Sequence, residues 1–195
     1  SFVLPVASHG PYSTYLRPTA YLECDQPLIA AMAREAAGSE HRAPQAARRL
    51  ERYGREQIRE KSLDMGFATA LETARALRGD CSEHAVLLAA LARAIGLPSR
   101  VVVGLAYVGT HAYGQHSDTG LFLFHVWTEV LVAPDRWMPL DAALGRFDAT
   151  HIALTKSDMG TASPLADLCL PVLELIETLR IGEVELVAAT PQLTR

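Results

Sequence analysis

The spacing of apolar residues changes near the middle of the chain. Between residues 25 and 96 they recur every three or four positions, which is the spacing of one face of an α-helix. Between residues 100 and 140 they form continuous β-branched runs bounded by turn residues, which is typical of strands. Helices followed by strands indicate an α+β fold, with a helical N-terminal half packed on a mostly antiparallel sheet.

Four helices are predicted in the first half, bounded by residues that commonly start or stop helices. They cover residues 27–37 with Asp25 as the cap, 44–58, 67–77 ended by Gly79, and 81–95. In the second helix, charged residues such as Glu51 lie opposite the apolar stripe and are expected to form a solvated surface. The fourth helix has a wide apolar face, so we expect it to be the central buried one.

Three strands, a late helix and a last strand are predicted in the second half. They cover residues 100–108, 121–132, 136–140, 164–179 and 183–189. The polar, glycine-containing segment 109–120 is expected to be a mobile surface loop beside a site. Residues 1–20 are rich in proline, serine and tyrosine and are expected to form an extended arm.

The length and composition favour a single domain over residues 1–195, with residues 160–195 as its C-terminal helix and strand. A chain of 195 residues that is 49% hydrophobic can bury a sizeable core. The net charge of -4 supplies no positive field, so neither nucleic acid nor an anionic membrane is an expected partner. The apolar runs are too short to cross a bilayer as helices, so the chain is expected to be soluble and not inserted in a membrane.

The three cysteines, Cys24, Cys81 and Cys169, lie far apart and form no C-x-x-C pair. This spacing argues against a disulfide framework and against a multi-cysteine zinc site. His111, His116 and His151 also lack a paired-ligand spacing, so no metal and no cofactor are expected.

Cys81 is the first candidate for chemistry, because a Gly-Asp turn leads it into the apolar helix. The positive end of the helix dipole would favour its thiolate, the form that attacks carbonyl carbons. Unpaired backbone N–H groups there could also hold an oxyanion. The alternative is that Cys81 is simply a small buried residue, and we expect this of Cys24 and Cys169.

His125 and Asp141 lie on neighbouring predicted strands. Alternation along the first strand puts His125 on one face with Trp127 and Glu129. The Pro134-Asp135 turn returns the chain beside it, although a bulge or an uneven loop must adjust the register before Asp141 can meet the imidazole. Separately, these two could be a core histidine and a turn former; together they indicate a base and its orienting acid.

Residues 79–104, GDCSEHAVLLAALARAIGLPSRVVVG, resemble the core signature of transglutaminase-like proteins in their bacterial branch. Residues 125–130, 137–141 and 149–152 resemble later blocks of that family in the right order. The resemblance covers a core of about residues 43–154 and implies a papain-like cysteine protease fold. It makes Cys81 the nucleophile, His125 the base and Asp141 the orienting acid. A bacterial cytoplasm or periplasm would suit such a protein.

The resemblance implies acyl transfer from peptide or carboxamide carbonyls of a peptide or protein substrate. Hydrolysis by a cysteine protease or amidase is favoured over cross-linking, because water is in excess unless a site excludes it. The cleft around the thiol is expected to include Trp127, Glu83 and His84, with capping of the backbone or pairing with a cation as the favoured role of Glu83. The alternative is a binding or scaffold module that keeps the fold without turnover.

Overall fold

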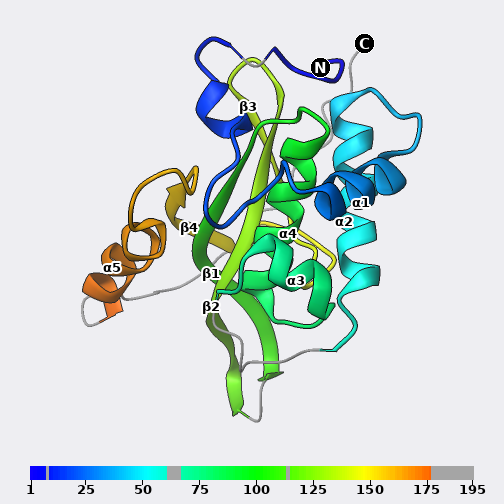
Figure 1. Ribbon diagram of the computed structural model, residues 1–195. Coiled ribbons are helices and arrows are strands. Elements are labelled where there is room, and N and C mark those ends of the chain that lie inside the picture. Colours follow the sequence, from blue (N-terminus) through cyan, green and yellow to red (C-terminus); the bar gives the residue numbers. More distant parts are fainter. Residues whose placement is uncertain (8, 61–66, 113–114, 177–195) are drawn as a thin grey trace, which may run out of the picture.

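A computed structural model describes residues 1–7, 9–60, 67–112 and 115–176 (Figure 1). Within these residues it has five α-helices, one short 3-10 helix (η1, Ser13–Leu16) and four strands, so the α+β prediction is confirmed. The helices are α1 (Pro27–Ala37), α2 (Ala43–Gln57), α3 (Ala70–Ala76), α4 (Cys81–Ala94) and α5 (Pro164–Ile176). The strands are β1 (Ser99–Ala112), β2 (Gln115–Ala133), β3 (Arg136–Leu140) and β4 (His151–Ser157). None of the helices in these ranges is long and apolar enough to cross a membrane.

The four strands form one antiparallel sheet in the order β3-β2-β1-β4. The long β1–β2 hairpin dominates it (Figure 1). The predicted mobile loop at residues 109–120 is wrong, because both strands continue into this segment and His111 pairs with His116 in the ladder. The register shifts on either side of Gly109, which has φ of 89°, so this glycine marks a bulge instead of a loop.

Strand β4 was not predicted as a strand. It pairs with β1 at one edge of the sheet, and its residues do not alternate cleanly between buried and exposed. An edge strand without this alternation lacks the period that identifies a strand in a sequence. Helix α5 packs against β4 and β1 at this edge (Figure 1).

The helical predictions are correct in position and less accurate at the ends. Gln26, not Asp25, is the N-cap of α1. Helix α3 begins after a capping box at Thr69 and ends at Leu77, which adopts the left-handed conformation in place of the predicted stop at Gly79. The late helix is present to Ile176, and the predicted last strand at residues 183–189 lies outside the described residues.

Helix α4 is the buried centre of the molecule, as predicted. Every residue from Ser82 to Arg93 is buried, and the helix packs on β2, where the Thr128 hydroxyl donates a hydrogen bond to the carbonyl of Ala85 at 2.8 Å. Helices α1, α2 and α3 surround α4 (Figure 1). This packing fixes the first residue of α4, Cys81, relative to the sheet.

Candidate active site

Two carboxylates fix the first turn of α4. The Asp80 side chain accepts hydrogen bonds from the backbone N–H and the hydroxyl of Ser82, at 2.9 and 2.8 Å. The Glu83 carboxylate accepts one from the backbone N–H of Asp80 at 2.9 Å, which completes a capping box. Position 79 must be glycine for this turn, because a Cβ there would lie 2.4 Å from the Cβ of Glu83. Cys81 is therefore held rigidly at the first helical position.

The capping carboxylates change the electrostatics expected at Cys81. Burial, followed by the negative charge of Asp80, raises the pKa of the Cys81 thiol to about 12, while the backbone N–H of Val126 acts in the opposite direction. The sequence had suggested that the helix end would favour the thiolate. That expectation is corrected, because Asp80 and Glu83 already occupy the positive end of the helix.

His125 lies on the part of β2 that extends beyond its pairing with β3. Within the described residues, β3 pairs with β2 only from Thr128 to Ala133, so no third strand covers the β2 edge at His125. The ladder shifts by one residue between Leu131 and Ala133, which confirms that the register needed adjustment. Because β3 stops early, the start of α4 can approach the strand that carries His125.

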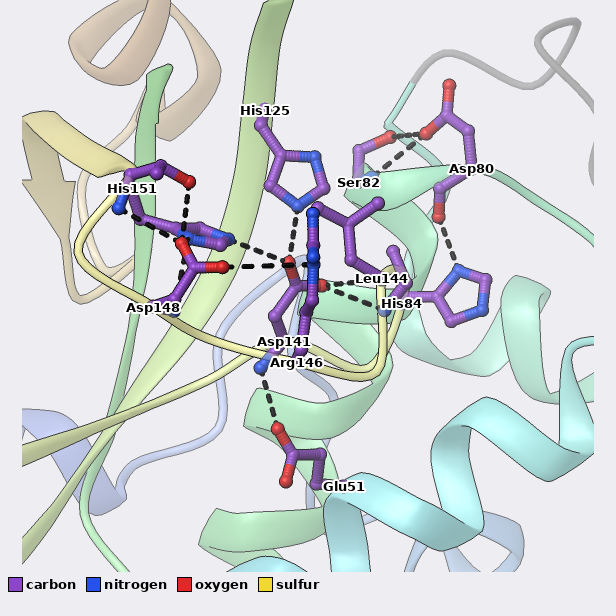
Figure 2. Close-up of polar contacts among 12 residues, drawn as sticks. Glu51, Asp80, Ser82, His84, His125, Asp141, Leu144, Arg146, Asp148 and His151 are labelled. Atoms are coloured by element: carbon purple, nitrogen blue, oxygen red, sulfur yellow. Dashed lines mark hydrogen bonds and ion pairs between the residues drawn. The ribbon is translucent and has the colours of Figure 1, made fainter. Parts of the chain in front are cut away.

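Asp141 follows directly after β3 and binds the imidazole. Its Oδ2 atom lies 2.7 Å from Nε2 of His125 (Figure 2). Its Oδ1 atom accepts hydrogen bonds from the backbone N–H groups of Ala143 and Leu144, at 2.9 and 3.0 Å. Burial opposes ionisation of Asp141, but the hydrogen bonds from His125, His151 and the backbone of Leu144 hold its pKa well below the usual range. Asp141 is therefore an ionised, oriented acceptor for His125.

His151 is a second imidazole on the same carboxylate oxygen. Its Nε2 atom lies 3.1 Å from Oδ2 of Asp141, and its Nδ1 atom lies 3.4 Å from Oδ1 of Asp148 (Figure 2). Burial lowers the pKa of His151, but the hydrogen bonds and charges of the two aspartates raise it more, so it lies above its ordinary value. Sequence analysis placed His151 in a family block and gave it no role.

A metal ion is one alternative use of this cluster. The ligand atoms of His125, Asp141 and His151 all lie within 4.8 Å of one another. However, Oδ2 of Asp141 already accepts hydrogen bonds from both Nε2 atoms, and the Asp141 and His151 side chains are each only 1% exposed. These residues therefore already bond to one another, in a continuous hydrogen-bonded chain from His125 through Asp141 and His151 to Asp148.

Glu51 of α2 is the other site residue that sequence analysis missed. It was expected on a solvated surface, but it is buried, and its Oε1 atom accepts a hydrogen bond from the backbone N–H of Asp141 at 2.8 Å (Figure 2). Its Oε2 atom pairs with the largely exposed Arg48 at 2.8 Å. Helix α2 thus helps to hold Asp141 in position through this hydrogen bond.

Cys81 and His125 both line two cavities, of about 310 and 220 Å³. Asp80 and Phe124 also line both cavities. The structure therefore brings the predicted nucleophile and base to one solvent-accessible corner, with Asp141 behind the imidazole. A ligand could extend from Cys81 and His125 into either cavity.

The three residues that were predicted to line the cleft lie elsewhere. Among the described residues that line the two cavities, Trp127, Glu83 and His84 do not occur. Glu83 is fully buried and also accepts a hydrogen bond from the backbone N–H of Ala68, while Nδ1 of His84 contacts the carbonyl oxygen of Asp80.

Trp127 is 1% exposed and supports the histidines instead of facing the cavities. Its ring stacks on that of His125, at 6.3 Å between centroids, and meets His151 edge-on at 5.5 Å. Its six-membered ring lies over Gly104, where an added Cβ would come within 2.7 Å of Cη2. The predicted shared face of His125 and Trp127 is confirmed.

Known structures share this fold. A candidate cysteine protease from Cytophaga hutchinsonii is 19% identical, with a TM-score of 0.65, over 82% of this chain and 50% of that one. The periplasmic domain of TgpA from Pseudomonas aeruginosa, bound to ethylmercury, is 21% identical, with a TM-score of 0.48, over 67% of this chain and 48% of that one. This chain thus spans about half the length of each. At 19% identity, the likeness to the Cytophaga hutchinsonii structure shows the fold alone.

The sequence comparisons give the family. No curated protein matches the sequence significantly. The family model described as the transglutaminase-like superfamily matches residues 30–142, which is more than half of the chain and includes Cys81, His125 and Asp141. The chain therefore belongs to the transglutaminase-like superfamily.

Proposed function

We propose that the protein is a thiol-dependent acyl-transfer enzyme that acts on peptide or carboxamide carbonyls. Cys81 is the nucleophile, His125 the base and Asp141 the residue that orients the base. The observation that carries the proposal is that Cys81 and His125 line the same two cavities while Asp141 holds Nε2 of His125. Membership of a family with this residue pattern supports it.

Proton transfer begins with His125. Its Nε2–H group donates to Asp141, which leaves Nδ1 as the nitrogen that can accept the thiol proton from Cys81. The sulfur then adds to the carbonyl carbon, and the C=O π electrons move to the oxygen, for which the backbone N–H of Cys81 is the proposed donor, because the Asp80 side chain already caps the N–H of Ser82. Collapse of this adduct breaks the C–N bond, and the departing amine takes the proton from His125. A thioester on Cys81 remains.

The raised pKa of the Cys81 thiol bears on how its proton is lost. Burial and the neighbouring charge of Asp80 raise the pKa of the Cys81 thiol, so they disfavour a resting thiolate at pH 7. We therefore expect His125 to take the proton as the sulfur attacks, so that Cys81 acts with general-base assistance.

Hydrolysis is the favoured second half-reaction. Water attacks the thioester with His125 as base, and the C–S bond breaks to release a carboxylic acid and restore the thiol. Both cavities open to solvent, so water is in excess at the site. Incubation with a peptide library, with and without a primary amine and analysed by mass, separates the outcomes: cleavage or loss of ammonia supports hydrolysis, whereas amine adducts would favour cross-linking.

The nucleophile can be tested without a known substrate. Alkylation of Cys81 by iodoacetamide at pH 7 should be about 10²- to 10⁴-fold slower in His125→Ala, because the assisting base is lost. Peptide mapping by mass identifies the modified cysteine. Cys169 lines the larger cavity and is an internal reference for reagent access.

The alternative function is a binding or scaffold module that keeps the fold without turnover. In that case Cys81 would react no faster than Cys169, and His125→Ala would change neither rate. This outcome would refute the enzyme proposal.

A further inference from the structure

The larger cavity next to Cys81 has an extended apolar wall that proton transfer alone does not require. Its volume is about 310 Å³. The apolar wall is formed by Phe67, Val103 of β1, Phe124 of β2, and Cys169, Val172 and Leu173 of α5. Segments that are distant in the sequence thus meet around one space, which opens at Cys81 and His125.

Helix α5 is firmly attached as one side of this wall. Leu168 and Val172 are buried in the hydrophobic core, and the Leu168 carbonyl accepts a hydrogen bond from the Thr155 hydroxyl of β4 at 2.9 Å. The inner part of the cavity, formed with Val103, therefore has a defined shape.

The outer part of the wall leaves large apolar side chains in water. Phe124 is 49% exposed and Leu173 is 57% exposed, although both line the cavity. Contiguous exposed apolar surface beside reactive groups is typical of a ligand-binding surface, because a bound apolar group removes it from water. Asp80 is the carboxylate in the same wall, and it disfavours an anionic ligand.

We propose that this cavity binds a branched aliphatic or aromatic side chain of the substrate, adjacent to the carbonyl that Cys81 attacks. This inference rests on the proposed acyl-transfer function and adds its substrate class. A cavity of about 150 Å³ lined by leucine, isoleucine and phenylalanine can hold benzene, so the space here is sufficient for such a side chain. Burying it should favour the apolar substrate about 10- to 100-fold over a small polar one.

The experiment compares two alkylating reagents, N-benzyliodoacetamide and N-(2-hydroxyethyl)iodoacetamide. In both reactions the sulfur of Cys81 displaces iodide to form a thioether, and the thiol proton passes to His125. Rates are divided by those with free N-acetylcysteine, which removes intrinsic differences in reactivity, and the site is assigned by peptide mapping. We expect Cys81 to prefer the benzyl reagent by at least about 10-fold.

The chain offers a matched pair of variants on α5. Leu173 and Leu170 are 57% and 56% exposed, but among the described residues only Leu173 of the two lines the cavity. Leu173→Asp should reduce the preference about 10-fold, because it places a charge in the wall, whereas Leu170→Asp should change it by less than about twofold. Both positions are on the surface, and unfolding midpoints verify that the variants are folded.

Equal normalised rates for the two reagents, with labelling that still depends on His125, would overturn the substrate assignment and leave the proposed function intact. An equal loss of preference in Leu170→Asp and Leu173→Asp would also overturn it. Slow labelling that His125→Ala does not change would instead refute the proposed function, and the substrate assignment with it.

Discussion

Two buried carboxylates on the same sheet differ in what surrounds them. Glu129 of β2 is 7% exposed and pairs with Arg100 of β1, at 2.5 Å, and with Lys156 of β4, at 3.1 Å. Asp141, at the end of β3, is 1% exposed and pairs with His125 and His151. Each acid has two basic partners, and the two acids cannot be distinguished by burial alone.

The partners distinguish the two acids. Arginine and lysine stay charged at neutral pH, so Glu129 can only hold β1, β2 and β4 together. Imidazoles gain and lose protons near neutral pH, and His125 also faces cavities that Cys81 lines. The proposed catalytic acid is therefore distinguished by partners that can exchange a proton and by access to a cavity, and not by its number of ion pairs.

The largest expected effect is that of Asp141→Asn on reactivity. The amide cannot stabilise a protonated His125 and can leave it in the wrong tautomer, so alkylation of Cys81 should slow about 10²- to 10⁴-fold. The measurement is the rate of iodoacetamide labelling at pH 7. Glu129→Gln is the matched control and should leave this rate within about twofold, so a similar loss in both variants would contradict the distinction.

The same Glu129→Gln variant should lose stability. Glutamine keeps one oxygen acceptor but removes the negative charge that Arg100 and Lys156 share, and Lys156 is 41% exposed and can be solvated. We therefore expect a decrease of about 1–3 kcal/mol in the free energy of unfolding, less than for a fully buried pair. Urea unfolding measures it, and an unchanged midpoint would show that the pair does not stabilise the sheet.

The next effect concerns His151, the second imidazole on Asp141. His151→Ala should slow labelling of Cys81 about tenfold, because Asp141 loses one of the hydrogen bonds that orient its carboxylate. His151→Gln retains a side-chain N–H donor and should recover part of the rate. If the alanine and glutamine variants were equally slow, donation to Asp141 would not be the role of His151.

Local patterns were sufficient to predict the elements that hold the candidate catalytic residues. Helix α4 has a long apolar stripe with clear end signals, and Cys81, His125 and Asp141 each occur in a recognisable block. Glu51 could not be found in this way, because it contacts Asp141 across 90 positions and lies on a highly charged helix. The thiol pKa was misjudged for a local reason, since Glu83 was expected to cap the backbone but the negative charge of Asp80 beside the thiol was not considered.

Glu51 itself should have a smaller effect on the site. In Glu51→Ala the backbone N–H of Asp141 loses its acceptor, and labelling of Cys81 should slow about threefold. Glu51→Gln keeps a side-chain oxygen and should label at nearly the wild-type rate. A matching loss in the glutamine variant would mean that the charge of Glu51, and not its hydrogen bond, supports Asp141.

The smallest expected effect is a pH dependence of stability that originates at His151. Its pKa is raised in the folded protein because Asp141 and Asp148 outweigh burial, so folding favours the protonated imidazole. This stabilisation is complete below the unfolded value of about 6.5 and is lost as the pH rises through the folded pKa. The wild type should therefore exceed His151→Gln in unfolding free energy by more at pH 6 than at pH 9, as measured by urea titration. Glu129→Gln should show no such change between the two pH values, because the partners of Glu129 are an arginine and a lysine and not imidazoles. A constant difference between the wild type and His151→Gln would indicate that His151 acts only by packing against Trp127 and Phe147.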